Sequence, residues 1–412
     1  MRRALAAVAL VLLLGAGAVA GYVLYKRHEA RNIRGSATQE FVTTEVTKPV
    51  KRTPEIVWPT YGYDNERVKA VTGFDVHPPY RVQWAFRARK LLEFPPVIAY
   101  GKLYIANNLG VLFAIEARTG NEKWHYDARR CTAASPAVAK RLVYQVFLNR
   151  PPCNAQGSSL DGEVVAFLAR GGKVRWRRTI GPSETSPLVA NGLVYVGDWL
   201  GKVYAFDANT GKTRWTFSTG GKVKGGVALS GNRVYFGSYD GHVYALNART
   251  GRQIWRASAQ ARLGPTGTFY ATPAVAYGRV YIGSTDHKVY SYGATTGEVR
   301  WSHTTGSYVY SSPAVWRLSV YIGSHDGNLY CFDAATGDVR WRYDAHGVIS
   351  GSPTVIDGVV YFSTARNRTF ALNARNGKVL WQFPDGQYTP AVADSKKLYL
   401  VGHTRLFALL PK

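Results

Sequence analysis

The chain has 412 residues, a hydrophobic content of 46% and a net charge of +26, with 42 Gly, 27 Tyr and 11 Trp but one Met. The hydrophobic content allows a large core to be buried, and glycine with aromatic residues favours many short strands over a helical bundle. In a cytosolic protein this charge would suggest a nucleic-acid partner. For an exported chain we predict no nucleic acid and expect anionic lipids or acidic wall polymers as counterparts, with a solvated arginine-rich surface as the alternative.

Residues 4–25 are mostly apolar and uncharged, and their length is sufficient to span a bilayer as a helix. We predict that they form a transmembrane signal-anchor, preceded by a cytoplasmic stub at 1–3. A cleaved secretory signal is the alternative, because Ala18, Val19 and Ala20 form an A-x-A cleavage pattern. Both interpretations export the rest of the chain if the N-terminus stays inside. The predicted location is the cell membrane, with a single pass and the main domain on the extracytoplasmic side.

Two segments separate this stretch from the remainder of the chain. Residues 26–57 are polar and lack apolar periodicity, which predicts a flexible linker. Residues 58–79 are rich in aromatic side chains, among them Trp58, Tyr61 and Phe74. We expect this lead-in to pack on the following domain as ordered coil.

A repeat of about 40 residues then extends to the C-terminus. Seven windows align without a gap on the pattern A-x-x-G-x-x-x-W: 108–124, 160–176, 199–215, 239–255, 285–301, 325–341 and 365–381. Each unit predicts four short strands: strand a in a stretch such as SPAVA, b in VYxG, c in VYAFxA and d in the run that ends in Trp. DG and TG dipeptides between them fit tight turns that need a positive φ. Four strands per repeat of this length are typical of a β-propeller blade.

Eight tryptophans mark the predicted strands d: Trp84, Trp124, Trp176, Trp215, Trp255, Trp301, Trp341 and Trp381. The last repeat stops before its Trp strand, whereas Trp84 lies in a strand without the rest of its repeat. Together they complete one blade. We therefore predict an all-β, eight-bladed propeller over 80–412 that is closed by its N-terminal strand, with the eight indoles as structural residues between blades.

The windows resemble the repeats of pyrroloquinoline-quinone-type (PQQ-like) propellers, and WPTYGYDNER (58–67) with PPYRVQWAF (78–86) is similar to the lead-in segment of that family. The resemblance covers the chain from residue 58 to its end. WD-repeat propellers fit poorly, because the windows lack paired GH and WD signatures. The PQQ-like family includes quinoprotein dehydrogenases, outer-membrane assembly propellers and sensor ectodomains, so the resemblance implies the fold and leaves the activity open.

The family's enzymes supply a test of catalysis. The resemblance implies that a dehydrogenase would use a vicinal Cys–Cys disulfide against the quinone, a calcium ion held by Glu and Asn, and an Asp base. The sequence contains no adjacent cysteines, no C-x-x-C-H pattern and no HExxH motif. Asp161, Asp240 and Asp326 are explained as turn formers in predicted b–c hairpins. We therefore predict no catalytic, cofactor-binding or metal-binding residue, with neither PQQ nor calcium required.

Two insertions interrupt the repeat on one predicted face. The d–a connections and b–c turns of a propeller share a face, and residues 256–270 lengthen one d–a connection while residues 145–162 lengthen one b–c turn. Cys131 and Cys153 fall on this insertion face, which favours a disulfide between them over two free thiols. Cys331 lies alone in an apolar run and is predicted to be a buried free thiol.

Loops on a rigid scaffold usually carry function, so the insertion face is the predicted binding face. Its candidate residues are Glu184, Lys224, Arg262, Tyr270, Tyr310 and His346. The predicted function is a non-catalytic binding or assembly scaffold of the cell envelope, with an envelope protein as partner. One alternative is a receptor for an acidic polymer or lipid, whose binding would depend steeply on salt. A quinone-dependent dehydrogenase is the other alternative.

Overall fold

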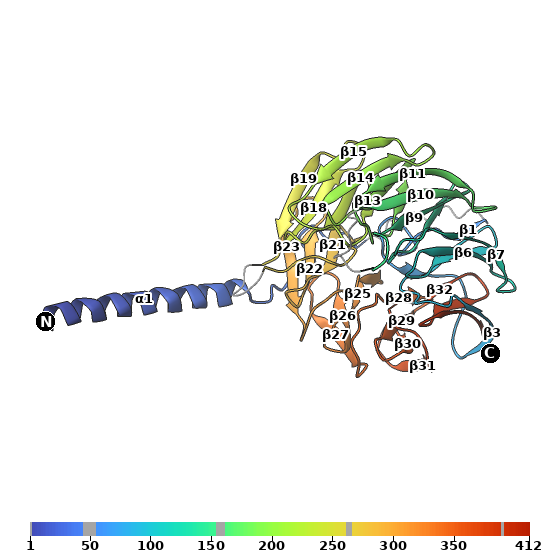
Figure 1. Cartoon of the computed structure of the whole chain (residues 1–412). Helices are drawn as coiled ribbons and strands as arrows, with labels where there is room; N and C mark the ends of the chain where they lie inside the picture. The colour runs from blue at the N-terminus through green and yellow to red at the C-terminus, as the bar shows by residue number, and fades with distance from the viewer. Residues whose placement is uncertain (1, 44–54, 154–160, 261–265, 389–390) are drawn as a thin grey trace.

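The computed structural model describes residues 2–43, 55–153, 161–260, 266–388 and 391–412. Over these residues, eight β-sheets stand as blades around a central axis (Figure 1). Strands a of neighbouring blades contact one another at the centre of the ring, and strands d lie outermost. The predicted eight-bladed, all-β propeller is confirmed.

The blades follow one another along the chain, which passes from strand a to strand d within each of the first seven. Blade 1 comprises β4 (Val97–Ala99), β5 (Lys102–Ala106), β6 (Val111–Glu116) and β7 (Glu122–Asp127), and blade 2 comprises β8 (Ala137–Ala139), β9 (Leu142–Phe147), β10 (Gly162–Leu168) and β11 (Val174–Ile180). Blade 3 comprises β12 (Leu188–Ala190), β13 (Leu193–Gly197), β14 (Lys202–Asp207) and β15 (Thr213–Ser218), and blade 4 comprises β16 (Ala228–Ser230), β17 (Arg233–Gly237), β18 (His242–Asn247) and β19 (Gln253–Ser258).

Blades 5 to 8 continue this order, and the last takes its strand d from the N-terminal side of the domain. Blade 5 comprises β20 (Ala274–Ala276), β21 (Arg279–Gly283), β22 (Lys288–Gly293) and β23 (Val299–Thr304), and blade 6 comprises β24 (Ala314–Trp316), β25 (Ser319–Gly323), β26 (Asn328–Asp333) and β27 (Val339–Asp344). Blade 7 comprises β28 (Thr354–Ile356), β29 (Val359–Thr364), β30 (Arg368–Asn373) and β31 (Val379–Phe383), and blade 8 comprises β32 (Val392–Ala393), β33 (Leu398–Val401), β34 (Arg405–Pro411) and β3 (Tyr80–Arg87).

The repeat motif holds neighbouring blades together. At six junctions among the described residues, the strand-d indole N–H donates to the backbone oxygen of the motif alanine in the next blade, over 2.8–3.2 Å. The motif glycine lies against the same indole: a Cβ on Gly337, which has a φ of 77°, would lie 2.7 Å from the Trp301 ring. Positive φ and this close approach together require glycine there. The motif is thus the docking site for the tryptophan of the preceding blade.

Blade 8 joins the two ends of the propeller, with β3 paired antiparallel to β34. Trp84 of β3 stacks on Gly120 of blade 1, where a Cβ would lie 2.6 Å from the indole. Its buried Nε1 has no hydrogen-bond partner in the described part of the chain. Trp381 meets blade 8, whose strands c and d are the separate segments β34 and β3 with no c–d turn between them. Its ring packs edge-on against Tyr80 at 5.0 Å between ring centroids. The closing blade therefore departs from the repeated junction on both sides.

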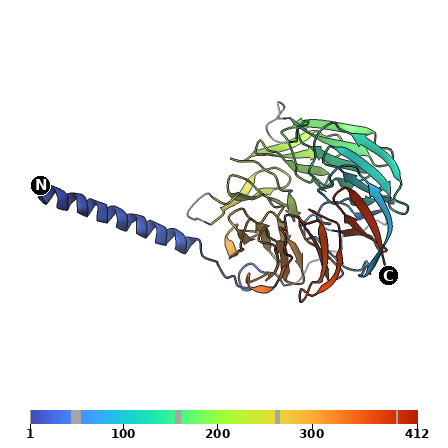
Figure 2. The ribbon, with the colours of Figure 1, turned by 60° about the horizontal axis from the view of Figure 1, so that its bottom comes forward.

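One helix, α1 (Arg2–Glu29), extends away from the ring in both views (Figures 1 and 2). Among the described residues, no helix combines the length and the apolar character needed to cross a membrane. The predicted transmembrane signal-anchor over 4–25 is therefore not supported by the structure.

Residues 30–43 lie against blades 5 and 6, and we call this segment the strap. Ile33 forms a β-bridge with Ser302 of β23. Further along, Glu40 pairs with Arg300 at 2.8 Å. This part of the predicted linker over 26–57 is therefore docked on the propeller, where ion pairs and backbone hydrogen bonds hold it, and does not behave as a free tether. Residues 44–54 of the linker lie outside the described residues.

The lead-in circles the inside of the ring. β1 (Ile56–Trp58) extends blade 1 beside β4, and β2 (Ala70–Val71) pairs in parallel with β28 of blade 7. Between them, backbone oxygens of five lead-in residues accept hydrogen bonds from strands a of blades 2, 4, 5, 6 and 7: Pro59, Asn65, Glu66, Val68 and Lys69. We call residues 59–71 the plug, because they fill the centre of the ring. The expected ordered packing of the lead-in is thus observed, but as a central element of the fold.

The plug depends on buried charged side chains. Arg67 is 0% exposed and donates hydrogen bonds to the backbone oxygens of Tyr61, Ser186 and Val227, among others. Burial lowers the pKa of Arg67 to about 10, and burial together with the charge of Arg67 lowers the pKa of Lys69 to about 7. One guanidinium therefore ties the plug to two neighbouring blades.

Candidate ligand-binding funnel

A cavity of about 570 Å³ lies at the centre of the insertion face, and we call it the funnel. Residues of the d–a connections and b–c turns form its wall, and Tyr61 of the plug belongs to its lining. Because the plug fills the centre of the ring, the funnel opens on the insertion face. A concave site of this size, with aromatic walls and a few polar groups, is typical of ligand-binding pockets.

Eight equivalent positions, one from each blade, line the funnel. Each lies four residues before strand a, at the end of the d–a connection. We call this set the rim ring: Glu93, Ala133, Glu184, Lys224, Tyr270, Tyr310, Ser350 and Tyr388. The repeat thus brings eight side chains to one place, while the residue type differs from blade to blade.

The structure brings together four of the six predicted binding-face residues. Glu184, Lys224, Tyr270 and Tyr310 all belong to the rim ring. His346 does not belong to it: it lies eight residues before β28, its side chain is 82% exposed, and its ring pairs with Asp344 at 3.2 Å. The corresponding rim position of that blade is Ser350.

Arg262, the sixth predicted residue, lies outside the described residues. Several lining residues were missed by sequence reasoning. The four-residue spacing before strand a, applied to every blade, would have found Glu93 and Ser350. Trp199 and Tyr239 come from b–c turns, and their approach to the funnel depends on the packing of neighbouring blades, which spacing alone does not provide.

Lys224 lies in an aromatic cage. Its Nζ is 4.5 Å from the ring centroid of Trp199 and 5.5 Å from those of Tyr239 and Tyr270. The same ammonium pairs with Glu184 at 2.9 Å, and the Trp199 indole N–H donates to that Glu184 oxygen at 2.9 Å. Aromatic faces combined with a carboxylate form the arrangement by which proteins bind ammonium groups. In the funnel this arrangement is filled by a side chain of the protein itself.

The aromatic wall continues from the cage into blade 6. The ring of Tyr270 packs edge-on against Tyr310 at 5.1 Å, and Tyr310 packs edge-on against His325 at 4.8 Å. His325 Nε2 and the Ser350 hydroxyl form a hydrogen bond of 2.8 Å. Burial lowers the pKa of His325, so the neutral ring is favoured at this point of the wall.

Two carboxylates in the funnel, Glu93 and Glu184, shift the pKa values of neighbouring groups. Burial, followed by the negative charge of Glu184, raises the pKa of Glu93 to about 7. The charge of Glu184, followed by burial, raises the pKa of Tyr270 well above its usual value. Burial and the charge of Glu93 raise the pKa of Tyr388. Each shift reflects negative charge held in a place from which water is partly excluded.

Hydroxyl groups fix the connections beneath the rim ring. The Thr272 backbone N–H donates to Ser312 Oγ at 2.9 Å, and the Ser312 N–H donates to Ser352 Oγ at 2.9 Å. The Tyr61 hydroxyl of the plug also donates to Ser352 Oγ, at 2.7 Å. These bonds run from blade to blade and from the plug to the wall, so the lower part of the funnel is cross-linked by short polar contacts.

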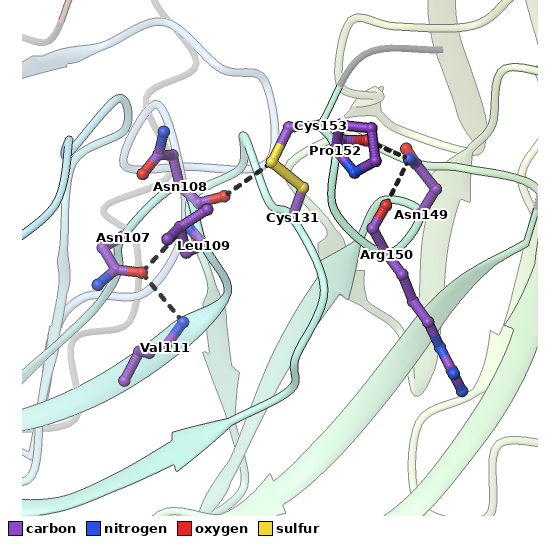
Figure 3. Close-up of a disulfide and its surroundings, with 9 residues drawn as sticks. All are labelled: Asn107, Asn108, Leu109, Val111, Cys131, Asn149, Arg150, Pro152 and Cys153. Carbon is purple, nitrogen blue, oxygen red and sulfur yellow. Dashed lines mark hydrogen bonds between the residues drawn. A yellow bond between two sulfur atoms is a disulfide. The ribbon is translucent and has the colours of Figure 1, made fainter. Parts of the chain in front are cut away.

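Cys131 and Cys153 form a disulfide at the edge of the funnel, with an S–S distance of 1.98 Å and 5.5 Å between the Cα atoms (Figure 3). Both residues belong to the funnel lining. The Cys153 sulfur lies 4.0 Å from the backbone oxygen of Asn108 in blade 1. The predicted disulfide is confirmed, and it anchors the beginning of the blade 2 insertion beside the pocket.

Two other predictions concern residues outside the funnel's centre. Cys331 is a buried free thiol, and burial raises its pKa to about 12. Asp326 accepts hydrogen bonds from the Asn328 N–H at 2.8 Å and from the Gly306 N–H of the preceding blade at 2.7 Å. Its geometry is therefore that of a turn former that also links two blades. In the described part of the chain, no three His, Cys, Asp or Glu residues are grouped to hold a metal ion.

The family model described as outer membrane protein assembly factor BamB matches residues 80–198, 199–315 and 309–412. The chain belongs to this family. The matched ranges cover the whole of the propeller, so the resemblance inferred from the repeat windows is confirmed. PQQ-type propellers are also its neighbours among solved structures.

Curated relatives of the chain differ in function. They include the BamB protein of Burkholderia pseudomallei, 32% identical over 30% of this chain and 30% of the relative, and the quinoprotein alcohol dehydrogenase PedH of Pseudomonas putida, 26% identical over 44% and 33%. The quinohemoprotein alcohol dehydrogenase of Comamonas testosteroni has a similar structure, with a TM-score of 0.74 at 15% identity, over 91% of this chain and 84% of that one. The chain spans a third or less of the length of these curated relatives, and the structural likeness shows the fold alone.

The quinone of the family's dehydrogenases can be tested against the funnel residues. PQQ is a tricarboxylate and needs cationic groups to hold it. Lys224 is the one Lys or Arg side chain among the described lining residues, and it already pairs with Glu184. Glu93 adds a second carboxylate to the same space. The residues present do not fit an anionic quinone, because its carboxylates would lie beside two glutamates.

Proposed function

We propose that the protein is a non-catalytic binding propeller of the cell envelope, which recruits a partner through the funnel on its insertion face. The observation that carries this proposal is the contrast within the repeat. Positions that dock blades keep one motif, whereas the eight rim positions hold Glu, Ala, Lys, Tyr and Ser side chains around one cavity. A scaffold whose blade-docking positions share one motif, and whose cavity-lining positions differ in residue type, suits a binding site.

The relatives support a binding role as well as an enzymatic alternative. The family description names an assembly factor, and that role gives a precedent for a propeller that recruits proteins. An extracytoplasmic location is part of the proposal and is supported by the Cys131–Cys153 disulfide, because structural disulfides persist mainly in oxidising compartments. Protease treatment of spheroplasts tests the location: degradation of the propeller while a cytoplasmic marker protein stays intact is expected, and protection of both proteins would contradict it.

Site-specific photo-cross-linking in living cells tests the binding face. A photoreactive amino acid at Tyr310 or Ser350 in the funnel should form adducts with a partner protein. The matched control is Arg249, an exposed c–d turn residue on the opposite face. Adducts at the funnel positions but not at the control are expected. Equal labelling at all three positions, or labelling at Arg249 alone, would place the interaction elsewhere.

A receptor for an acidic polymer or lipid is the second candidate, favoured by the net charge of +26. Binding to anionic vesicles would weaken steeply between low and physiological salt, whereas a protein partner held in the funnel would dissociate less. The quinone-dependent dehydrogenase remains the alternative suggested by relatives such as PedH. Titration of the purified protein with PQQ and calcium, followed by absorbance and dye reduction, would reveal it.

A further inference from the structure

Blades 2 to 4, coloured from green to yellow in Figure 1, separate their charges between the two faces of the propeller. We call the face opposite the funnel the turn face, because the a–b and c–d turns of the antiparallel blades meet there. The carboxylates between residues 137 and 258 that lie at the insertion-face ends of the strands are Asp161, Glu163, Glu184, Asp198 and Asp240. The turn face of these three blades has one carboxylate, Asp207, which pairs with Arg214 at 2.7 Å.

The same turns carry exposed cations, and we call this set the cationic arc. Its members are Lys140, Arg141, Arg170, Lys173, Lys212, Arg249 and Arg252. None of them belongs to an ion pair within the part of the chain that the structure describes. A group of cations without compensating carboxylates produces a local positive potential that attracts polyanions.

Blades 5 and 6 carry the opposite charge at a matching place on the turn face. The repeat position after the motif glycine is cationic in blades 2 to 4, but Glu298 and Asp338 occupy it in blades 5 and 6. Asp338 pairs with Arg34 of the strap at 2.8 Å, and Glu298 pairs with Arg300 at 2.8 Å. The charges of that sector are thus satisfied within the chain, whereas those of the cationic arc face solvent.

Blade docking fixes the spacing of the cationic arc. The strand-d indole of each preceding blade donates a hydrogen bond to the alanine oxygen that opens the c–d turn, at Ala169, Ala208 and Ala248. Arg178 of blade 2 also donates to the backbone oxygen of Gly211 in the c–d turn of blade 3, at 2.8 Å. The three turns are therefore held relative to one another, and a ligand that reaches several of them need not order them first.

From this charge pattern we propose that the cationic arc binds a linear acidic polymer, a chain with repeated phosphate or carboxylate groups that runs across the c–d turns of blades 2 to 4. Guanidinium and ammonium groups on adjacent turns pair with successive anionic groups of the polymer. The turn tips, residues 170–173, 209–212 and 249–252, contain no apolar side chain. A bilayer-binding surface adds apolar side chains that enter the acyl region, so the composition of the tips favours a polymer over a membrane.

The proposal goes beyond the proposed function, because the cationic arc lies on the face opposite the funnel. The experiment measures binding of the full-length protein to immobilised long-chain polyphosphate and to poly-glutamate by biolayer interferometry. The affinity for either polymer should fall about tenfold or more between about 50 and 200 mM salt, because each ion contact releases counterions. Orthophosphate at the same phosphate concentration should not compete, because a single group cannot reach several turns.

Removal of four arc cations tests the site directly. One variant that combines Arg170→Gln, Lys173→Gln, Arg249→Gln and Arg252→Gln should bind both polymers about tenfold more weakly at low salt and show a smaller salt dependence. Thermal unfolding checks that the variant is folded.

The matched control removes four exposed cations of the insertion face, as Arg87→Gln, Lys90→Gln, Arg366→Gln and Arg368→Gln. It loses the same net charge as the arc variant. Its affinity for the polymers should change by less than about twofold, because salt screens cations that lie on the far face.

Three outcomes would overturn the inference. Equal weakening by the two four-residue variants would show that net charge, and not the cationic arc, holds the polymer. Tighter binding to vesicles of phosphatidylglycerol and phosphatidylcholine than to either polymer, lost in the arc variant, would assign the arc to a membrane surface. No binding to either polymer at low salt would leave the arc as a solvated surface.

The two conclusions fail separately. The ligand of the cationic arc is not a protein, so Arg249 stays a valid control for protein adducts at the funnel. Funnel cross-links in the arc variant would support the proposed function whether or not the polymer binds, and polymer binding would be retained if the funnel gave no adducts.

Discussion

The blade junctions and the plug hold the same ring together by opposite means. Each repeated junction uses one tryptophan, one alanine oxygen and one glycine, as at Trp301, Ala334 and Gly337. The plug occurs once and uses a fully buried arginine, Arg67, which donates to backbone oxygens around it. A junction combines an aromatic contact with one hydrogen bond, and the same contact recurs around the ring. The plug is polar and specific to one place.

This difference accounts for the position of the funnel. Seven windows with one motif produce a ring that is nearly equivalent from blade to blade, and such a ring would leave its centre open. The plug adds a single non-repeating segment inside the ring and contributes Tyr61 to the funnel lining. The repeated blades therefore form the rigid wall of the funnel. The plug, which occurs once, closes the centre of the ring, so the wall encloses a pocket.

The largest expected effect concerns the junctions. Trp301→Ala should lower the free energy of unfolding by about 4–5 kcal/mol, because the indole is 0% exposed and contacts both Gly337 and the strap. Trp84→Ala should cost less, about 3 kcal/mol, because its indole N–H has no partner among the described residues and its ring is partly exposed. Chemical denaturation measures both. Equal losses would show that the closing junction is as strong as the repeated ones.

The plug should respond differently from a junction. Arg67→Met should lower the free energy of unfolding by about 3–4 kcal/mol, because backbone oxygens in two blades lose their donor inside the protein. Arg249→Met, at an exposed turn, is the control and should change the stability by less than about 0.5 kcal/mol. Limited proteolysis should cut the plug in the Arg67 variant while the blades stay folded. Cooperative loss of blades and plug together would mean that the ring depends on its plug.

The contrast also explains what the sequence could predict. Blade number, strand order and the closing blade follow from the tryptophan motif, because each repeat encodes the same local contacts. The disulfide between Cys131 and Cys153 followed from placing both on one face. The path of the plug did not, because it depends on one-off hydrogen bonds to six blades that no local pattern encodes. His346 lies outside the funnel for a related reason: the rim position is set by the distance to strand a, which puts Ser350 in the funnel.

Matched glycines separate the docking contact from backbone strain. Gly337 and Gly73 have φ values of 77° and 84°, so alanine strains the backbone at both. A Cβ on Gly337 would also lie 2.7 Å from Trp301, whereas a Cβ on Gly73 in the lead-in would meet nothing within 4 Å. Gly337→Ala should therefore cost about 2–3 kcal/mol and Gly73→Ala about 1 kcal/mol. Equal costs in thermal unfolding would show that the indole moves aside and that the motif glycine serves the turn alone.

The smallest effect is expected in the funnel and depends on pH. The pKa of Glu93 rises from 4.5 to about 7 in the folded protein, so the ionised form is disfavoured by folding. The resulting stability is complete below pH 4.5 and is lost as the pH rises through 7. Glu93→Gln should thus be neutral at pH 4.5 and stabilise the protein by about 1–2 kcal/mol at pH 8, after allowance for partial exposure.

Thr132→Val is the control for this change, since Thr132 lines the same pocket and its hydroxyl bonds the Val146 backbone oxygen and the Gln145 amide, neither of which titrates. Its effect on the free energy of unfolding should be the same at both pH values. A stabilisation by Glu93→Gln that did not vary with pH would mean that the side chain's shape, and not its charge, limits stability in the funnel. The predicted pH dependence would instead show that the buried charge of Glu93 lowers the stability of the propeller at high pH, a cost of the kind that functional sites retain.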